Sequence, residues 1–381
     1  MIVRHKTREV RCGKLVIGGE HPIWVQSLTT TKTADLEATK AEIRRMLEAG
    51  CEIVRVAVFD QADAQALGAV KRFLGDVPLV ADIHFNYKFA LEAIEQGVDK
   101  VRLNPGNVGG LAGRFDDAGK ERVRIVAEAA RRKGISMRVG VNSGSVEKDL
   151  LEKHGWATSE ALVESALRHC EWLERCGFRD IVVSLKSTNM EYVIDAYLRF
   201  ARMTDYPLHV GVTEAGLPGY GTIKSAIGIG RILLDGVGDT IRVSLTGDKA
   251  LEIQAAYDIL KATGRRVREP EIVACPACGR IAIDLERIVR EVKERIRDVQ
   301  VPMRISILGC AVNGPGEAAE ADIGVAGGRG EGMIFRKGKL LRRVKESAMV
   351  DELEREIRAL AAERQAAGAA SPGEVRVSHQ P

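Results

Sequence analysis

The segment SEALVESALRHCEWLERCG (159–177), followed by DIVVSLKS (180–187), contains the unit from which most of the chain is built. The first part has the apolar spacing of an amphipathic helix and ends at a glycine. The second part is an apolar, β-branched run that is typical of a buried strand. The same alternation occurs eight times in the first 264 residues. The other seven runs are IWVQSL (23–28), EIVRVAV (52–58), PLVADIHF (78–85), KVRLNPGN (100–107), ISMRVGVN (135–142), PLHVGVTEAG (207–216) and TIRVSLTGD (240–248).

Strands that alternate with helices pair in parallel, and eight such units predict closure into a (β/α)8 barrel of the TIM type. The alternative is an open, doubly wound α/β sheet. No G-x-G-x-x-G sequence follows the first strand, and the count of units is eight. Both observations favour the barrel, which we place at residues 1–264.

The remaining chain predicts a second, smaller domain. TGRRVREP (263–270) is charged and ends in proline, so we interpret residues 265–270 as a linker. Residues 271–365 contain a helical pattern (284–298), a strand (303–310), a hairpin-like stretch (321–344) and a last helix (350–365), which together indicate an α+β domain. The small and polar residues 366–381 are expected to form a disordered tail.

The bulk composition excludes several classes of protein. The net charge is only +4 and aromatic residues make up 4%, so a nucleic-acid partner is not expected. No segment approaches the roughly 20 apolar residues of a membrane span, and the first residues lack the apolar core of a signal peptide. We therefore expect a cytoplasmic protein. Seven cysteines, an odd number, argue against a disulfide framework.

Four predicted strands carry an arginine among apolar residues, and a fifth carries a lysine. The residues are Arg55, Arg102, Arg138, Arg242 and Lys186. A buried guanidinium without an acceptor is costly, and one alone could belong to a structural ion pair. Five cations exceed what the nearby acidic residues can neutralise, so we expect a ligand to supply negative charge. Arginine binds phosphate with two parallel hydrogen bonds, and four arginines predict a diphosphate.

Other polar residues follow the strands at the carboxyl end of the barrel, where the active site of this fold lies. Asp82 and Glu214 are candidates for proton transfer or for binding hydroxyl groups, or else they orient the neighbouring arginines. His84 and His209 are more simply explained as hydrogen-bonded structural histidines, although His84 could reach the lumen. The further candidates for substrate binding are Asn104, Asn142 and Ser244.

CPACGR (275–280) and ILGCAVNGPGEA (307–318) contain three cysteines, Cys275, Cys278 and Cys310, that resemble the ligands of one metal centre. A C-x-x-C pair also occurs in redox dithiols and zinc sites. A zinc site would add a second such pair or histidines, but no histidine lies between residues 210 and 378. Three thiolates from two loops fit a 4Fe–4S cluster in which one iron has a different ligand.

The fourth ligand remains open between two possibilities. Glu317 lies seven residues after Cys310, and a tight turn over 313–316 could bring its carboxylate back to the cluster. A carboxylate is harder and more labile than a thiolate, so a substrate oxygen could displace it. The alternative ligands are the four cysteines of the barrel, Cys12, Cys51, Cys170 and Cys176.

At this point the motifs resemble a known family. VADIHF, LNPGN, VGVNSGSVEKDL, TEAG, KSAIGIG, GDTIRVSLTGD, ACPACGR and LGCAVNGPGEA are similar in order and spacing to the bacterial 4-hydroxy-3-methylbut-2-enyl diphosphate synthases. The resemblance extends from about residue 5 to residue 362 and matches the short, two-domain form of the family.

The resemblance implies the function, the cofactor and the partners. The substrate would be 2-C-methyl-D-erythritol 2,4-cyclodiphosphate, reduced by two electrons in the non-mevalonate isoprenoid pathway. One 4Fe–4S cluster per subunit would be held by three cysteines and a glutamate, which match Cys275, Cys278, Cys310 and Glu317. The resemblance further implies flavodoxin or ferredoxin as the electron donor and a homodimer in which the cluster of one subunit covers the barrel mouth of the other. It also implies that the second domain is similar to a module of sulfite and nitrite reductases.

The resemblance assigns the diphosphate to seven residues of the barrel. These are Arg55, Arg102, Arg138, Asn142, Lys186, Arg242 and Ser244. Two other classes of protein are alternatives: a barrel enzyme without redox chemistry, such as a pterin-condensing synthase with a zinc domain, and a cluster-bearing regulator that binds nucleic acid.

Overall fold

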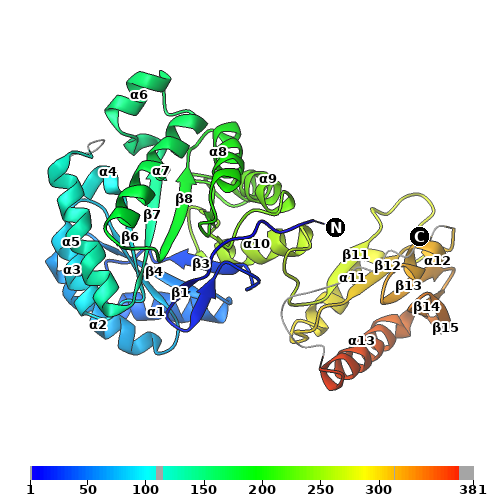
Figure 1. Cartoon of the computed structure of the whole chain (residues 1–381). Helices are drawn as coiled ribbons and strands as arrows, with labels where there is room; N and C mark the ends of the chain where they lie inside the picture. The colour runs from blue at the N-terminus through cyan, green and yellow to red at the C-terminus, as the bar shows by residue number, and fades with distance from the viewer. Residues whose placement is uncertain (1, 109–114, 313, 369–381) are drawn as a thin grey trace. The chain divides into compact units, whose positions relative to one another are not determined.

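The computed structural model describes residues 2–108, 115–312 and 314–368 (Figure 1). The chain divides into two compact units, residues 1–265 and residues 266–381, and each is described by itself. Most of the tail that was expected to be disordered, residues 369–381, lies outside the described residues, and the last helix ends at Ala366.

Unit 1 is a nearly closed barrel of parallel strands, which confirms the predicted fold. The sheet order is β8-β7-β6-β5-β4-β3-β10-β9, and an isolated parallel bridge between Val183 and Leu208 joins its two ends. The strands are β3 (Trp24–Leu28), β4 (Ile53–Val58), β5 (Leu79–Ile83), β6 (Lys100–Leu103), β7 (Ser136–Asn142), β8 (Ile181–Lys186), β9 (His209–Val210) and β10 (Thr240–Ile241).

Helices surround the barrel (Figure 1). Most of them begin at an Asp, Asn or Thr whose side chain accepts a hydrogen bond from a backbone N–H of the first turn. The helices are α1 (Leu36–Glu48), α2 (Gln61–Leu74), α3 (Tyr87–Glu95), α5 (Asp117–Lys133), α7 (Ser159–Arg175), α8 (Met190–Met203), α9 (Tyr220–Leu234) and α10 (Lys249–Ala262). Short helices α4 (Pro105–Val108), η1 (Ser143–Ser145) and α6 (Lys148–His154) lie in the connections.

The two faces of the strands belong to two different cores. Residues such as Val54 and Val56 pack outward with the helices in the large core of unit 1. The alternate residue Ile53 packs in a smaller core, together with Val80 and Val182. That inner core also contains an N-terminal hairpin, β1 (Val10–Cys12) and β2 (Leu15–Ile17), which sequence patterning did not predict. The hairpin therefore gives one end of the lumen an apolar floor.

Unit 2 is a five-stranded mixed sheet with helices on both faces. Strands β11 (Glu271–Ala274), β12 (Arg304–Leu308) and β13 (Ile323–Gly328) are parallel, and β14 (Glu331–Arg336) and β15 (Lys339–Lys345) continue the sheet antiparallel. The stretch predicted as one hairpin is thus a three-stranded meander. Helices α11 (Leu285–Arg295) and α13 (Met349–Ala366), the latter preceded by η2 (Glu346–Ala348), share one core with the sheet. The short helix α12 (Gly314–Ala319) belongs to a second, smaller core.

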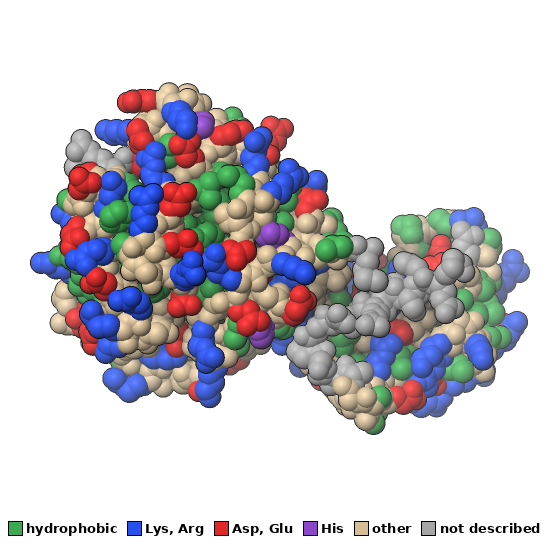
Figure 2. Space-filling model, in the orientation of Figure 1, with side chains coloured by type: hydrophobic (Ala, Val, Ile, Leu, Met, Phe, Trp, Pro, Cys, Tyr) green, Lys and Arg blue, Asp and Glu red, His purple; other side chains and the backbone are tan. Residues whose placement is uncertain are grey.

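The visible surface of unit 1 carries charged side chains of both signs. Figure 2 shows acidic and basic side chains interspersed over the visible face of unit 1, without a continuous basic stripe. In the part of the chain that the structure describes, no helix is both long and apolar enough to cross a membrane.

Candidate active site and metal centre

Strand register brings the predicted cations to one face of the barrel wall. Asp82 on β5 lies opposite Arg102 on β6, and Arg102 lies opposite Arg138 on β7. Register partners in a parallel sheet point to the same side. Arg55 lies opposite Val80, two residues before Asp82, and Val80 belongs to the inner core. All four charged side chains therefore face the lumen, above its apolar floor.

Asp82 is the acidic centre of this group. Its carboxylate lies 3.1 Å from Nη1 of Arg102 and 3.8 Å from Nε of Arg55. Burial acts to raise the pKa of Asp82, but the charges of Arg102 and Arg55 outweigh it and hold the pKa well below the ordinary value. Asp82 is thus a charged partner of two arginines, which agrees with one of the three roles expected for it.

Arg138 has no such partner. Its side chain is among the largest fully buried ones, at 1% exposure. None of its three guanidinium nitrogens has a hydrogen-bond partner among the described residues. Burial, together with the charges of Arg55 and Arg102, lowers the pKa of Arg138 well below its ordinary value. A guanidinium in this position carries an unfavourable energy that an anion in the lumen would relieve.

Two lysines add to the positive charge. Lys186, at the end of β8 and opposite Asn142, is 8% exposed. Burial and the nearby arginines lower the pKa of Lys186 well below its ordinary value. Lys100 is 1% exposed and lies opposite Val80, so it faces the lumen near the floor beside Cys12. Sequence reasoning missed Lys100 because it stands at the start of its strand. We call Arg55, Lys100, Arg102, Arg138, Lys186 and Arg242 the cationic basin.

The other predicted barrel residues differ in their hydrogen-bond partners and in their exposure. Asn142, with its amide oriented to satisfy both polar atoms, accepts a hydrogen bond from Nη2 of Arg102 at 3.2 Å. Asn104 instead donates to Ser145 Oγ at 2.5 Å. His84 lies 3.4 Å from the carboxylate of Asp82, with a side chain that is 44% exposed. His209 is buried and its Nδ1 lies 2.8 Å from Thr240 Oγ1, as in a structural histidine.

Glu214 and Ser244 follow the last two strands. Ser244 is half-buried between Val243 and Leu245. Glu214 is exposed, and its φ of 52° places it in the left-handed region that residues other than glycine rarely adopt. Such backbone strain is found more often at functional positions than elsewhere.

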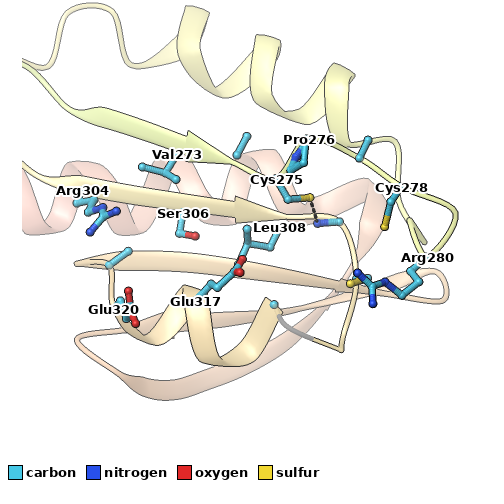
Figure 3. Close-up of a pocket in the computed structure, with 16 residues that line it drawn as sticks. Val273, Cys275, Pro276, Cys278, Arg280, Arg304, Ser306, Leu308, Glu317 and Glu320 are labelled. Carbon is cyan, nitrogen blue, oxygen red and sulfur yellow. Dashed lines mark hydrogen bonds between the residues drawn. The ribbon is translucent and has the colours of Figure 1, made fainter. Parts of the chain in front are cut away.

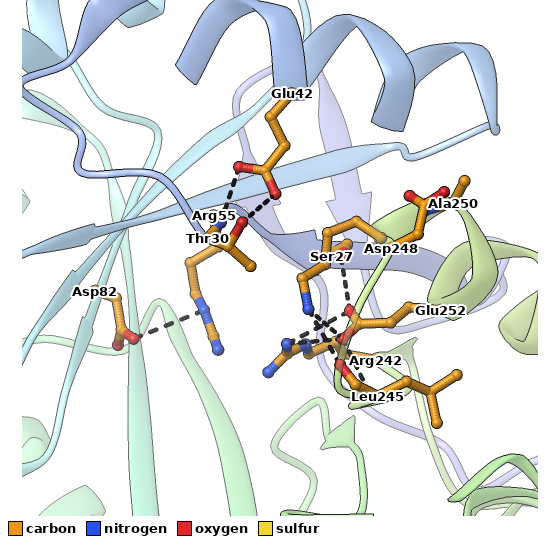
Figure 4. Close-up of polar contacts among 11 residues, drawn as sticks. Ser27, Thr30, Glu42, Arg55, Asp82, Arg242, Leu245, Asp248, Ala250 and Glu252 are labelled. Atoms are coloured by element: carbon orange, nitrogen blue, oxygen red, sulfur yellow. Dashed lines mark hydrogen bonds and ion pairs between the residues drawn. The ribbon is translucent and has the colours of Figure 1, made fainter. Parts of the chain in front are cut away.

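Arg242 contacts an acidic residue that sequence reasoning did not identify. Its Nη2 lies 3.3 Å from Oε1 of Glu252 on α10 (Figure 4). Sequence reasoning counted only Asp82 and Glu214 against the five cations, because Glu252 stands within a helical pattern. The spacing of Glu252 from Lys249, three residues earlier on the same helix, was the available signal.

The second group of predicted residues lines one cavity of about 490 Å³ in unit 2 (Figure 3). Cys275 follows β11, Cys310 follows β12, and Glu317 lies on α12. We call this cavity, lined by Cys275, Cys278, Cys310 and Glu317, the cysteine pocket. The sequence predicted a tight turn before Glu317, but residues 314–319 form a short helix instead. Asn313, the first residue of the predicted turn, lies outside the described residues.

Hydrogen-bond donors contact two of the cysteines in the pocket. The backbone N–H of Gly309 donates to Cys275 Sγ at 3.3 Å. Hydrogen bonds from the backbone and the side chain of Arg280 lower the pKa of the exposed Cys278. Ala277, between the two cysteines, has a φ of 53°, which turns the chain sharply within the C-x-x-C segment.

The donor set fits a cluster better than a single ion. No three His, Cys, Asp or Glu side chains converge on one metal position in residues 2–108, 115–312 and 314–368. A cubane cluster has an iron at each of four separate corners, so its ligands surround a cavity rather than meet at a point. Three thiols and a carboxylate around one pocket are consistent with that requirement.

The four remaining cysteines have a different environment. Cys12, Cys51 and Cys170 are buried, and burial raises the pKa of each, to about 12 for Cys51. Cys176 is half-buried, and desolvation raises the pKa of its thiol too. All four belong to unit 1 and behave as small apolar residues or inert thiols.

Comparison with known proteins places both units in one family. Residues 7–257 match the model of the GcpE TIM-barrel domain, and residues 271–359 match that of the GcpE C-terminal domain.

Curated relatives match over nearly the whole chain. A protein of Geobacillus kaustophilus (strain HTA426), named 4-hydroxy-3-methylbut-2-en-1-yl diphosphate synthase (flavodoxin), is 53% identical over 95% of this chain and 94% of its own. A protein of Bacillus cereus (strain G9842) with the same name is 51% identical over 95% of both chains.

Solved structures resemble unit 1 only distantly. The dihydropteroate synthase of Thermus thermophilus is 16% identical, with a TM-score of 0.49 over 67% of this chain and 98% of that chain. The enzyme of Yersinia pestis is 15% identical, with a TM-score of 0.47 over the same share of this chain and 98% of its own. A similarity of this size does not bear on the function.

Proposed function

The chain belongs to the GcpE family of 4-hydroxy-3-methylbut-2-en-1-yl diphosphate synthases, and from this premise we propose how its residues serve the reaction. The enzyme makes 4-hydroxy-3-methylbut-2-enyl diphosphate in the non-mevalonate isoprenoid pathway. It opens the ring of 2-C-methyl-D-erythritol 2,4-cyclodiphosphate and removes a hydroxyl group as water, and this consumes two electrons and two protons.

Our assignment of the diphosphate to the barrel rests on one observation, the burial of Arg138 without a hydrogen-bond partner in the described chain. A fully buried guanidinium without an acceptor, next to Arg102 in the sheet, matches an anion with several oxygens. A small neutral substrate would leave this charge unpaired. The cyclic diphosphate supplies negative charge where the basin needs it.

The other barrel residues complete the proposed substrate site. Arg55, Arg102, Lys186 and Arg242 would bind phosphate oxygens, and Asp82 would orient the first two of them. Asn142, held by Arg102, and Ser244 would donate hydrogen bonds to the diphosphate. We assign the less charged part of the substrate to His84 and Asn104.

The cysteine pocket would hold one 4Fe–4S cluster per subunit, with Cys275, Cys278 and Cys310 as thiolate ligands and Glu317 as the fourth ligand. A bound cluster would supply single electrons and a Lewis-acidic iron. The N–H of Gly309 and the Arg280 side chain would stabilise the thiolates that bind it. Glu214, exposed after β9, would donate or hold the proton at the departing hydroxyl oxygen.

The electron donor we propose is flavodoxin, which the names of the relatives specify, with ferredoxin as the alternative. We also propose a homodimer, and analytical ultracentrifugation of the full chain measures this directly.

The function is tested with protein purified without oxygen. We expect a brown protein with about four iron and four sulfide per chain. With the cyclic diphosphate and reduced flavodoxin, ³¹P NMR should detect the linear diphosphate product, and reduced ferredoxin in a parallel assay ranks the two donors. A colourless protein with stoichiometric zinc, or the absence of product with both donors, would contradict the proposal.

A further inference from the structure

Glu252 on α10 joins the outer layer of the barrel to the basin. Its carboxylate is 1% exposed and accepts hydrogen bonds from four groups. These are Lys249 Nζ at 2.7 Å, Ser27 Oγ at 2.9 Å, the backbone N–H of Leu245 at 2.9 Å, and Arg242 Nη2 at 3.3 Å (Figure 4). One carboxylate thus connects β3, the segment after β10, and the first turn of α10.

The segment that Glu252 fixes contains two proposed substrate contacts. Arg242 is contacted directly, and Ser244 precedes the residue whose N–H the carboxylate accepts. Nε of Arg242 is buried and has no hydrogen-bond partner in the described chain, so this nitrogen lacks an acceptor before a ligand binds. Only one of its terminal nitrogens contacts the carboxylate.

Arg242 acts electrostatically on the centre of the basin. The pKa of Arg55 is lowered to about 10, first by burial, which outweighs the favourable charge of Asp82, and then by the charges of Arg242 and Arg102. Figure 4 shows Arg55, held by Asp82, beside the cluster around Arg242. Arg242 therefore belongs to the same anion site as Arg55, and a shift of its guanidinium would alter that site.

We propose that Glu252 is a positioning residue that presets Arg242 and the 244–245 segment for the diphosphate; this inference rests on the proposed function. Its own negative charge opposes diphosphate binding, but Lys249 at 2.7 Å compensates much of that charge. The remaining effect is geometric, because a guanidinium and a loop held before binding lose less conformational entropy when the ligand arrives.

The charge of Glu252 and its positioning of Arg242 predict opposite changes in substrate affinity when Glu252 is substituted. If Glu252 only neutralised the basin, Glu252→Gln would make substrate binding tighter, by Coulomb's law. If it positions Arg242, the same substitution should weaken binding, because a neutral amide cannot accept from Lys249, Leu245 and Arg242 together. We expect the Kd to rise about tenfold, the size expected for loss of one charged hydrogen bond.

The experiment is isothermal titration of the cluster-loaded protein with 2-C-methyl-D-erythritol 2,4-cyclodiphosphate under anaerobic conditions, with steady-state kinetics in parallel. Glu252→Gln should raise Kd and KM and change kcat less than about twofold. The matched control is Glu42→Gln. Glu42 is a buried carboxylate on α1 that accepts from the backbone and hydroxyl of Thr30 and from the backbone of Thr31. Its substitution should leave the Kd at the wild-type value.

A double-mutant cycle separates positioning from a general loss of stability. In an Arg242→Ala background, Glu252→Gln should cause a smaller loss of affinity than in the wild type, because Arg242, one of the two elements that Glu252 positions, has been removed. Additive losses, an unchanged Kd or tighter binding in the single variant would each overturn the proposal. If Glu252→Gln does not fold, Glu252→Asp is used in the same cycle, since the shorter side chain keeps the charge but cannot reach all four partners.

Failure of this inference is distinct from failure of the proposed function. Wild-type protein that does not bind the cyclic diphosphate contradicts the substrate assignment itself. Wild-type protein that binds it, with no coupling between Glu252 and Arg242, contradicts only the positioning role.

Discussion

The cationic basin and the cysteine pocket hold their polar side chains in different ways. In the basin, charged residues stand on consecutive strands in fixed register, and Arg138 and Lys186 are 1% and 8% exposed. In the pocket, the proposed ligands lie after strand ends and on a helix of six residues, and Cys278 is exposed. Burial and the neighbouring arginines act against the charge of Arg138 in the basin, whereas the three cysteines of the pocket line one cavity.

The basin and the pocket are therefore expected to depend on their ligands in different ways. The proposed substrate site of the barrel has its charged side chains in place without a ligand, and the unfavourable energy of the buried charges favours an anion. If the pocket holds the proposed cluster, metal binding would bring its ligands together, because it provides folding energy at such sites. Changes in the basin should therefore affect affinity and stability, and changes in the pocket should affect cofactor content and turnover.

The largest effect is expected for Cys275→Ser. Loss of one thiolate should reduce the iron content of the purified protein strongly and bring activity below detection. The substrate should still bind to the barrel in a titration. Cys176→Ser, which changes a half-buried thiol of unit 1, is the matched control and should keep iron and activity. Equal iron content in both variants would contradict the assignment of the pocket.

Glu317→Ala should lower kcat by at least about 100-fold while the Kd for the cyclic diphosphate stays near its wild-type value. The reason is that the carboxylate belongs to the pocket and not to the basin. Glu320→Ala removes another carboxylate that lines the same pocket and serves as the control. Full activity in the Glu317 variant would exclude this residue from the mechanism.

Arg138→Ala should weaken substrate binding by roughly 1.5–3 kcal/mol, the contribution of a charged hydrogen bond. The apolar variant Arg138→Met should also increase the free energy of unfolding of the substrate-free protein, by about 1 kcal/mol, since it removes a buried charge without a partner. Arg102→Met should decrease it, because Asp82 then loses its partner at 3.1 Å. Urea denaturation of both variants measures the change in the free energy of unfolding. A change of the same sign in both would contradict the difference between Arg138, which has no partner in the described chain, and Arg102, which pairs with Asp82.

Gly140→Ala should weaken binding moderately. A Cβ at this position would lie 2.5 Å from Nε of Arg102, so the guanidinium must move. We expect the Kd to rise about fivefold, which corresponds to about 1 kcal/mol. At Gly144 an added Cβ meets nothing within 4 Å, so Gly144→Ala should bind like the wild type in the same titration.

The smallest effect is a dependence of affinity on pH through Lys186. The free protein lowers the pKa of Lys186, and a bound anion favours its charged form, so binding should take up a proton. Affinity should fall as pH rises from that lowered pKa toward the ordinary lysine value. Titration in buffers of different ionisation enthalpy measures the proton uptake, which Lys186→Met should abolish and Lys133→Met, on the outer helix α5, should not. Uptake that persists in Lys186→Met would assign it to another group.

The repeating pattern of strands and helices predicted the barrel because period-2 and period-3.6 patterns act locally along the chain. The positions of Arg55, Arg102 and Arg138 within apolar runs led to the prediction of a shared anion site; the structure places all three on the lumen face, and the anion itself stays a prediction. The N-terminal hairpin was missed because its strands have only three residues each and gain their burial from the lumen. Lys100 was missed because it stands at the start of its strand, although it lies on the same face as Arg102, two residues later.

The sequence by itself determined the eight-unit repeat, five of the six basin cations and the three cysteines with a nearby glutamate. The tertiary structure alone decided which cations have partners, so that Asp82 holds Arg55 and Arg102 while Arg138 has no hydrogen-bond partner in the described chain. It alone placed Glu252 against Arg242. The physical reason is that periodicity reports burial along one strand or helix, whereas charge pairing depends on distances across strands that only register and packing fix.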